Sequence, residues 1–174
     1  MLEWLSDTAG NEGGLMKKPQ RIETDAAENV VVLSISPTEE DHTALNRILS
    51  RPESTASTES RWTIYPAVAL ESALPLLREN PIAIVLSERD LAPGTWKDVL
   101  AETMNLSDPP LLIVASRLAD EYLWAEALNL GAYDVLAKPF DAEEVIRVLR
   151  SAWFHKCINL EIRNRSNLKM AAAG

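Results

Sequence analysis

The sequence predicts an α/β protein built as a three-layer, doubly wound, five-stranded parallel sheet with helices on both faces. Short apolar runs rich in β-branched residues alternate with segments of helical periodicity, and this pair repeats five times along the chain. The runs are apolar without interruption, which is typical of strands covered on both faces. Because 47% of the residues are hydrophobic, the chain can bury a sizeable core.

Composition narrows the classes of function. A chain of 174 residues fits one ordinary domain, and its formal net charge of −9 opposes attraction to nucleic-acid phosphates or anionic lipids, so we expect neither partner. Cys157 is the only cysteine, which excludes an internal disulfide and favours a reducing, cytoplasmic compartment. No stretch approaches the roughly 18 apolar residues of a membrane span.

We expect three parts: a flexible tail over residues 1–28, a domain over residues 29–154, and a helical extension with a tail over residues 155–174. The first part lacks a sustained apolar period. Its one apolar cluster consists of Leu2, Trp4 and Leu5. That cluster could dock on a partner, although contact with the chain's own domain is the simpler interpretation.

The first strand is predicted from Asn29 through "VVVLSIS", and it ends at Pro37 because proline cannot donate to a ladder. The next segment, "TEEDHTALNRILS", predicts a helix with Thr38 as its N-cap. We expect His42 to be solvated on this polar helix. A loop, "RPESTASTES", leads to a second strand, "RWTIYPA".

The remaining elements follow the same alternation. The second helix is "VALESALPLLREN", which Pro75 should kink or delay. The third strand is "IAIVLSE" and the third helix "TWKDVLAETM", capped by Thr95. The fourth strand is "LLIVAS" and the fourth helix "DEYLWAEALNL", which Gly131 closes. The fifth strand is "YDVLAKPF", and the fifth helix, "DAEEVIRVLRSAWFHKCINLEI", begins at Asp141.

Chemistry is expected at the carboxyl ends of these strands, where working groups gather in open parallel sheets. The residues there are Ser36-Pro37, Glu88, Ser116 and Lys138-Pro139. Their order, with "LGAYDVLAKPFDAEEV" and the "LAPG" turn, resembles the receiver domain of bacterial two-component response regulators over about residues 30–154. The resemblance implies flavodoxin-like topology with strand order 2-1-3-4-5.

Receivers accept a phosphoryl group on an aspartate after the third strand and hold Mg²⁺ with an acidic pair after the first. A hydroxyl and a lysine balance the added charge. The resemblance puts the hydroxyl at Ser116 and the lysine at Lys138. The acidic pair falls on Ser36 and Pro37, which supply no carboxylate oxygen. The sequence therefore departs from the receiver pattern at the metal site.

Three acidic residues lie close to the missing pair, but they fall in the first turn of the predicted helix. A capping or dipole role is the simpler interpretation for Glu39, Glu40 and Asp41. The two histidines, His42 and His155, are far apart in the chain, so we expect no metal site and no cofactor.

The acceptor position falls on Glu88, because receivers place a proline four residues after the aspartate and Ala92 stands there. Pro93 is shifted by one. A one-residue slip would bring Arg89 to the acceptor place, and Asp90 would need a two-residue slip that strand alternation disfavours. Glutamate carries an extra methylene, and an error near 1 Å in placing reacting atoms can cost roughly a hundredfold in rate.

These departures predict a degenerate receiver, or pseudo-receiver. We expect a non-enzymatic module of bacterial two-component signalling that acts by protein–protein interaction, with a histidine kinase or a downstream regulator as partner. Glu88 then either imitates a phosphorylated aspartate or only forms a structural ion pair with Lys138. The alternative function is a phosphorylatable receiver that uses Glu88 or Asp90 in a rearranged site.

Aromatic residues predict the interaction face. Tyr122, Trp124, Tyr133 and Trp153 lie on the fourth helix, fifth strand and fifth helix, which form the usual partner or dimer face of receivers, although some must be core. Val135 takes the place of the aromatic switch residue that receivers carry in the fifth strand. An apolar stripe continues along the last helix and outruns the domain, which suggests a homodimer. The stripe comprises Ile146, Leu149, Trp153, Cys157 and Leu160.

Overall fold

The computed structural model describes residues 29–51 and 61–171, so the cluster of Leu2, Trp4 and Leu5 and most of the predicted 51–60 loop lie outside the described residues. The strands are β1 (Asn29–Ile35), β2 (Arg61–Ala67), β3 (Ile82–Glu88), β4 (Asp90–Leu91), β5 (Gly94–Thr95), β6 (Leu111–Ser116) and β7 (Asp134–Ala137). The helices are α1 (Glu39–Leu49), α2 (Leu70–Glu79), α3 (Trp96–Met104), α4 (Glu121–Leu130) and α5 (Ala142–Ala171). No helix in these ranges is long and apolar enough to cross a bilayer.

The main sheet has five parallel strands in the order β2-β1-β3-β6-β7. This confirms the predicted three-layer fold and its order 2-1-3-4-5. An antiparallel pair, β4 and β5, forms a small separate sheet in the loop after β3, which we had not predicted. Because all five long strands run the same way, their carboxyl ends meet at one edge of the sheet.

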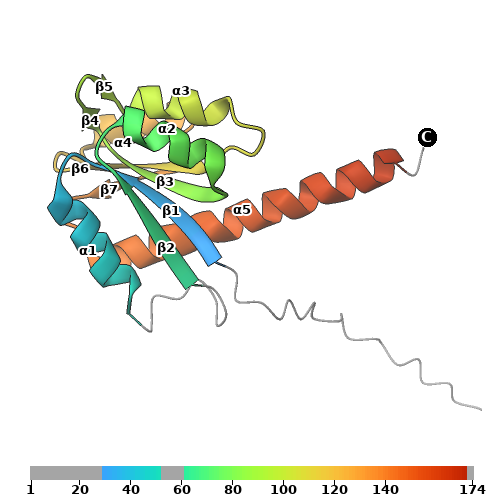
Figure 1. Ribbon diagram of the computed structural model, residues 1–174, viewed down its shortest axis with the longest axis horizontal. Helices are drawn as coiled ribbons and strands as arrows, with labels where there is room; N and C mark the ends of the chain where they lie inside the picture. Colours follow the sequence, from blue (N-terminus) through green and yellow to red (C-terminus); the bar gives the residue numbers. More distant parts are fainter. Residues whose placement is uncertain (1–28, 52–60, 172–174) are drawn as a thin grey trace, which may run out of the picture.

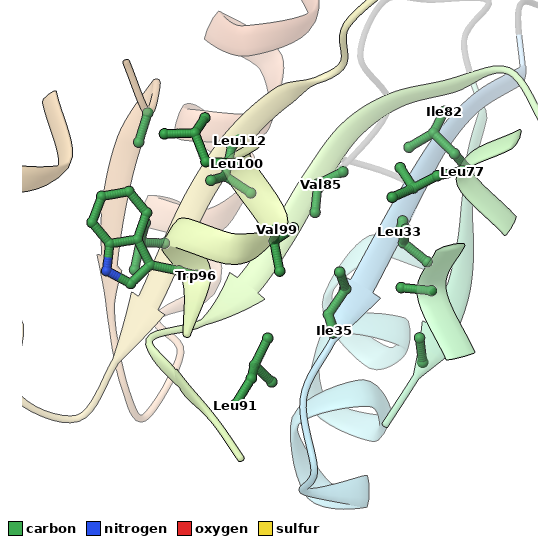
Figure 2. Packing of buried hydrophobic residues seen from close by; sticks show 14 of the residues in the cluster. Leu33, Ile35, Leu77, Ile82, Val85, Leu91, Trp96, Val99, Leu100 and Leu112 are labelled. Carbon is green, nitrogen blue, oxygen red and sulfur yellow. The ribbon is translucent and has the colours of Figure 1, made fainter. Parts of the chain in front are cut away.

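Each face of the sheet packs against its own hydrophobic cluster, and alternate residues of β1 enter opposite clusters. Val31, Leu33 and Ile35 join the cluster under α2, α3 and α4, whereas Val30 and Val32 join the cluster under α1 and α5. Figure 1 shows the two helix layers on either side of the sheet. Figure 2 shows the first cluster, in which Trp96 of α3 lies against the strands.

Local signals set most of the helix ends. The Thr95 hydroxyl accepts from the Lys97 N–H at 3.3 Å and the Asp98 carboxylate accepts from the Thr95 N–H at 2.8 Å, which confirms the predicted cap of α3. Gly131 closes α4 with a φ of 107°, in the left-handed region that favours glycine. Thr38 stands at the predicted N-cap of α1, but its side chain makes no capping hydrogen bond.

The helix α2 begins at Leu70, two residues later than predicted, and includes Pro75. Helix α5 ends later than predicted, at Ala171, and projects well beyond the body of the protein (Figure 1). The middle of α5 is attached to the loop before β6. The buried Lys156 ammonium donates to the Pro109 carbonyl at 2.8 Å and pairs with Asp108 at 2.9 Å. Arg163 pairs with the same Asp108 carboxylate at 3.0 Å.

Candidate functional site

The carboxyl edge of the sheet brings the predicted site residues into one neighbourhood. Glu88 and Ser116 are the last residues of β3 and β6, Ser36 follows β1, and Lys138 follows β7. The Lys138 N–H donates to the Ser116 carbonyl at 2.9 Å, so the strand ends are joined by their backbones. The strand order therefore brings Glu88, at the end of the central strand β3, and Lys138, after the outer strand β7, to the same edge of the sheet.

Lys138 lies between two carboxylates. Its ammonium forms ion pairs with Glu88 and with Asp41 of α1, and the exposed fractions of the three side chains are 7%, 16% and 13% in that order. The ion pair that we considered for Glu88 is thus formed. Asp41 lies in the first turn of α1, where the helix dipole favours an acid, but its carboxylate accepts from Lys138 and does not cap the helix. Asp41 joins the site because it stands one turn before Leu45 on the inward face of α1.

Ser36 holds Asp41 in this position, although it supplies no carboxylate itself. The Ser36 hydroxyl donates to Oδ2 of Asp41 at 2.6 Å and accepts from the Thr38 N–H at 3.2 Å. The same Oδ2 atom accepts from Lys138. A chain of hydrogen bonds therefore runs from the start of α1 through Ser36 and Asp41 to Lys138. It holds the Asp41 carboxylate against the Lys138 ammonium.

Glu88 is engaged through both of its oxygens, whereas Asp90 faces away. Oε2 of Glu88 accepts from Lys138, and Oε1 accepts from the Arg89 N–H at 3.2 Å. Arg89 directs its guanidinium to Asp90 at 3.0 Å, and the Asp90 side chain is 69% exposed. The structure thus brings Glu88, not Asp90, to the lysine.

The Ser116 hydroxyl forms its hydrogen bond within the loop that follows β6. It is buried and accepts from the Leu118 N–H at 3.1 Å. No hydrogen bond joins this hydroxyl to Glu88 or Lys138 within the described residues. Ser116 therefore contributes to the site through its backbone carbonyl, which accepts from the Lys138 N–H.

His42 is buried behind the charged cluster, so the expectation that it is solvated is wrong. Its Nε2 lies 3.1 Å from the Ser36 carbonyl and its Nδ1 lies 2.9 Å from the Ser34 hydroxyl. Because a carbonyl only accepts, Nε2 carries the proton, and a neutral ring then accepts from Ser34. His42 lies on the buried face of α1 with Leu45, and it ties that helix to the end of β1.

The residues present do not fit the magnesium ion that receivers hold. Mg²⁺ requires near-octahedral oxygen ligands, but Ser36 offers one hydroxyl that is already bonded and Pro37 offers no side-chain oxygen. The carboxylates of Asp41 and Glu88 both face the Lys138 ammonium, which places a fixed cation between them. Over residues 29–51 and 61–171, no group of three or more acidic, histidine or cysteine side chains could hold a metal.

The predicted aromatic face divides into two environments. Tyr122 and Trp124 are exposed on α4, and Tyr122 is the more exposed at 86%. Tyr133 packs against α5, where its hydroxyl lies 2.8 Å from the Ser151 hydroxyl. Trp153 is half-buried and packs against the core cluster under α1 and α5. The structure therefore leaves the two residues of α4 as the open part of this face.

Comparison with solved structures identifies receiver domains as neighbours. The signal receiver domain of an HD domain-containing protein from Pseudomonas fluorescens Pf-5 is similar at 26% identity and a TM-score of 0.64, covering 76% of this chain and 92% of that one. A CheY-like receiver domain protein from Methanospirillum hungatei JF-1 is similar at 13% identity and a TM-score of 0.64, covering 76% and 99%.

A response regulator from Burkholderia pseudomallei, solved with a phosphorylated aspartic acid, calcium ion and citrate, is similar at 19% identity and a TM-score of 0.58, covering 78% of this chain and 75% of that one. No protein-family model and no curated protein matches the chain. The chain thus has the flavodoxin-like fold of response-regulator receiver domains.

Proposed function

We propose that the chain is an atypical receiver module of two-component signalling that works by protein–protein contact and does not accept a phosphoryl group in the usual way. The observation that carries this proposal is the ion pair of Lys138 with both Asp41 and Glu88. In this arrangement the lysine that receivers use to balance a phosphoryl group already has two carboxylate partners.

The first supporting argument concerns the nucleophile. Glu88 stands where receivers carry the acceptor aspartate, and the Burkholderia neighbour was solved with a phosphorylated aspartic acid. Both oxygens of Glu88 accept hydrogen bonds, and its side chain is one methylene longer than that of aspartate. Attack on phosphorus needs an oxygen in line with the leaving group, so the extra length opposes it, and the hydrogen bonds to both oxygens lower their nucleophilicity.

The second argument concerns charge. Phosphoryl transfer depends on cations that neutralise the transferred group. By formal charge, the two carboxylates and one lysine of the cluster of Asp41, Glu88 and Lys138 sum to −1. An anionic phosphodonor would therefore approach an anionic site whose donor set does not suit Mg²⁺.

The cluster supports a constitutive structural role better than a responsive mimic. A mimic of a phosphorylated aspartate should engage both the lysine and the hydroxyl, but the Ser116 hydroxyl accepts from Leu118 instead. Val135, in the place of the switch aromatic, is buried in the core. We infer that Glu88 holds the edge of the sheet in one fixed state.

Partner contact is assigned to the exposed aromatic residues of α4 and to the projecting helix α5. Tyr122 and Trp124 offer large apolar side chains with polar edges, which is the composition of interaction hot spots. A histidine kinase or a downstream regulator is the class of partner that we propose for this face. Homodimerisation through α5 is the second contact that we propose.

Incubation of the full chain with acetyl phosphate and Mg²⁺, followed by intact mass spectrometry, tests this function. We expect no stable gain of one phosphoryl mass, while a conventional receiver treated in parallel gains it. A gain that disappears in Glu88→Gln or in Asp90→Asn would overturn the proposal. It would establish the alternative, a phosphorylatable receiver, and would identify which carboxylate accepts.

A further inference from the structure

A groove opens at the amino edge of the sheet, at the opposite end of the strands from Lys138. Its volume is about 600 Å³. It lies between the end of α2, the start of β3, the loop before β6 and residues 153–160 of α5. The apolar part of its lining comes from Leu77, Ile82, Leu106, Pro110, Trp153 and Leu160.

The charged residues of this groove are mainly cationic, although the whole chain is acidic. Arg78, Lys156 and Asp108 line it. Asp108 pairs with both Lys156 and Arg163. Arg78 makes no ion pair with another described residue. A ligand that combines apolar side chains with negative charge would therefore complement both the floor and the rim of the groove.

The chain itself carries such a segment. The first residues, "MLEWLSD", place Trp4 and Leu5 between the acidic residues Glu3 and Asp7, and Leu2 directly before Glu3. We propose that residues 2–7 dock in the groove of the same molecule. Trp4 is the anchor on the apolar floor, because an indole buries about 150–250 Å² and dominates small interfaces. Glu3 and Asp7 face the rim at Arg78, which is exposed, whereas the buried Lys156 is already paired with Asp108.

Connectivity favours this occupant over a separate partner. Residues 1–28 join the domain at Asn29, and Asn29 itself lines the groove. Residues 8–28 number 21, and a coil of that length spans roughly 25 Å from end to end, which is enough to reach a groove beside Asn29. Tethering raises the effective concentration to the order of millimolar, so a short motif with weak intrinsic affinity becomes bound.

Docking of residues 2–7 also bears on the proposed dimer. Leu160 lines the groove and belongs to the apolar stripe of α5. Docked residues 2–7 would cover Leu160, and would therefore compete with the α5 helix of a second copy for this part of the stripe. This consequence depends on the dimer, whereas the docking itself does not depend on the proposed function.

Backbone amide NMR spectra of the ¹⁵N-labelled full chain test the docking. Trp4→Ala should shift the amides that surround the groove, such as those of Ala83, Ser107 and Leu160, and should leave those of Arg89 and Lys138 unchanged. The matched control Leu15→Ala, in the same tail but outside residues 2–7, should leave both groups unchanged. Groove amides that do not respond to Trp4→Ala, or shifts centred on α4 instead, would overturn the proposal.

A second variant tests the groove side. Arg78 is exposed, so Arg78→Glu should preserve the fold while it moves the Trp4 indole signal toward its position in an unstructured peptide.

To separate docking within one molecule from docking on a second copy, ¹⁵N-labelled Trp4→Ala chain is mixed with unlabelled wild-type chain. We expect the groove amides to keep their variant positions. Their return to wild-type positions would show docking between copies and would contradict the proposal.

Discussion

Lys138→Met is expected to lower the free energy of unfolding by about 3–5 kcal/mol. The substitution keeps most of the volume of the side chain but removes the cation between Asp41 and Glu88. Both carboxylates are largely buried, so each would lose its counter-charge and would also repel the other. Breaking a buried ion pair on one side is costly because the remaining charge stays desolvated.

Denaturant unfolding followed by circular dichroism measures this cost. The matched control is Lys97→Met, which breaks the exposed ion pair with Glu126 and should cost about 1 kcal/mol or less. Adding Asp41→Asn and Glu88→Gln to Lys138→Met should recover much of the stability, because it removes the stranded charges. An equal loss of unfolding free energy in Lys138→Met and Lys97→Met would contradict the buried ion pairs of Lys138 with Asp41 and Glu88.

His42→Leu is expected to cost about 2–4 kcal/mol of unfolding free energy. Leucine fills the buried position but leaves the Ser34 hydroxyl and the Ser36 carbonyl without their ring partner. The same denaturant titration measures the change. His155→Leu is the matched control on an exposed position; it removes only the contact with the Tyr133 ring, 5.6 Å between centroids, and should cost about 1 kcal/mol or less.

A second variant separates the loss of hydrogen bonds from a packing effect. Ser34→Ala in the His42→Leu background removes one of the two orphaned groups, so it should restore part of the lost stability. The prediction about His42 fails if the single variant is as stable as the wild type, or if Ser34→Ala in that background only destabilises further.

The fold could be predicted because its signals are local. β-branched runs mark the buried strands, the Thr95–Asp98 pair marks the start of α3, and Gly131 marks the end of α4. The β4–β5 hairpin could not be predicted, since strands of two residues carry no period. The late end of α5 was missed because no glycine or proline follows residue 162 until Gly174.

The site was predicted in part, and the missing part lies on α1. Glu88 and Lys138 were found because they follow apolar runs directly. Asp41 and His42 were missed because the helix was judged by its polar composition instead of by its faces. Their positions share one face with Leu45, which was the available signal. Whether that face buries a charged cluster or meets solvent depends on the strand ends opposite, and a sequence does not show those contacts.

Titration of the ¹⁵N-labelled full chain with Mg²⁺ tests most directly whether Lys138 takes the place of the metal ion at the edge of the sheet. The amides of Arg89, Leu118 and Lys138 report on this site, because each hydrogen-bonds to a site residue. We expect them to shift no more than the amides of the exposed Glu143 and the half-buried Glu144 at the start of α5. A saturable shift centred on Arg89 and Lys138 would show that the carboxylates release the lysine and bind the metal, which would contradict the fixed ion-pair cluster.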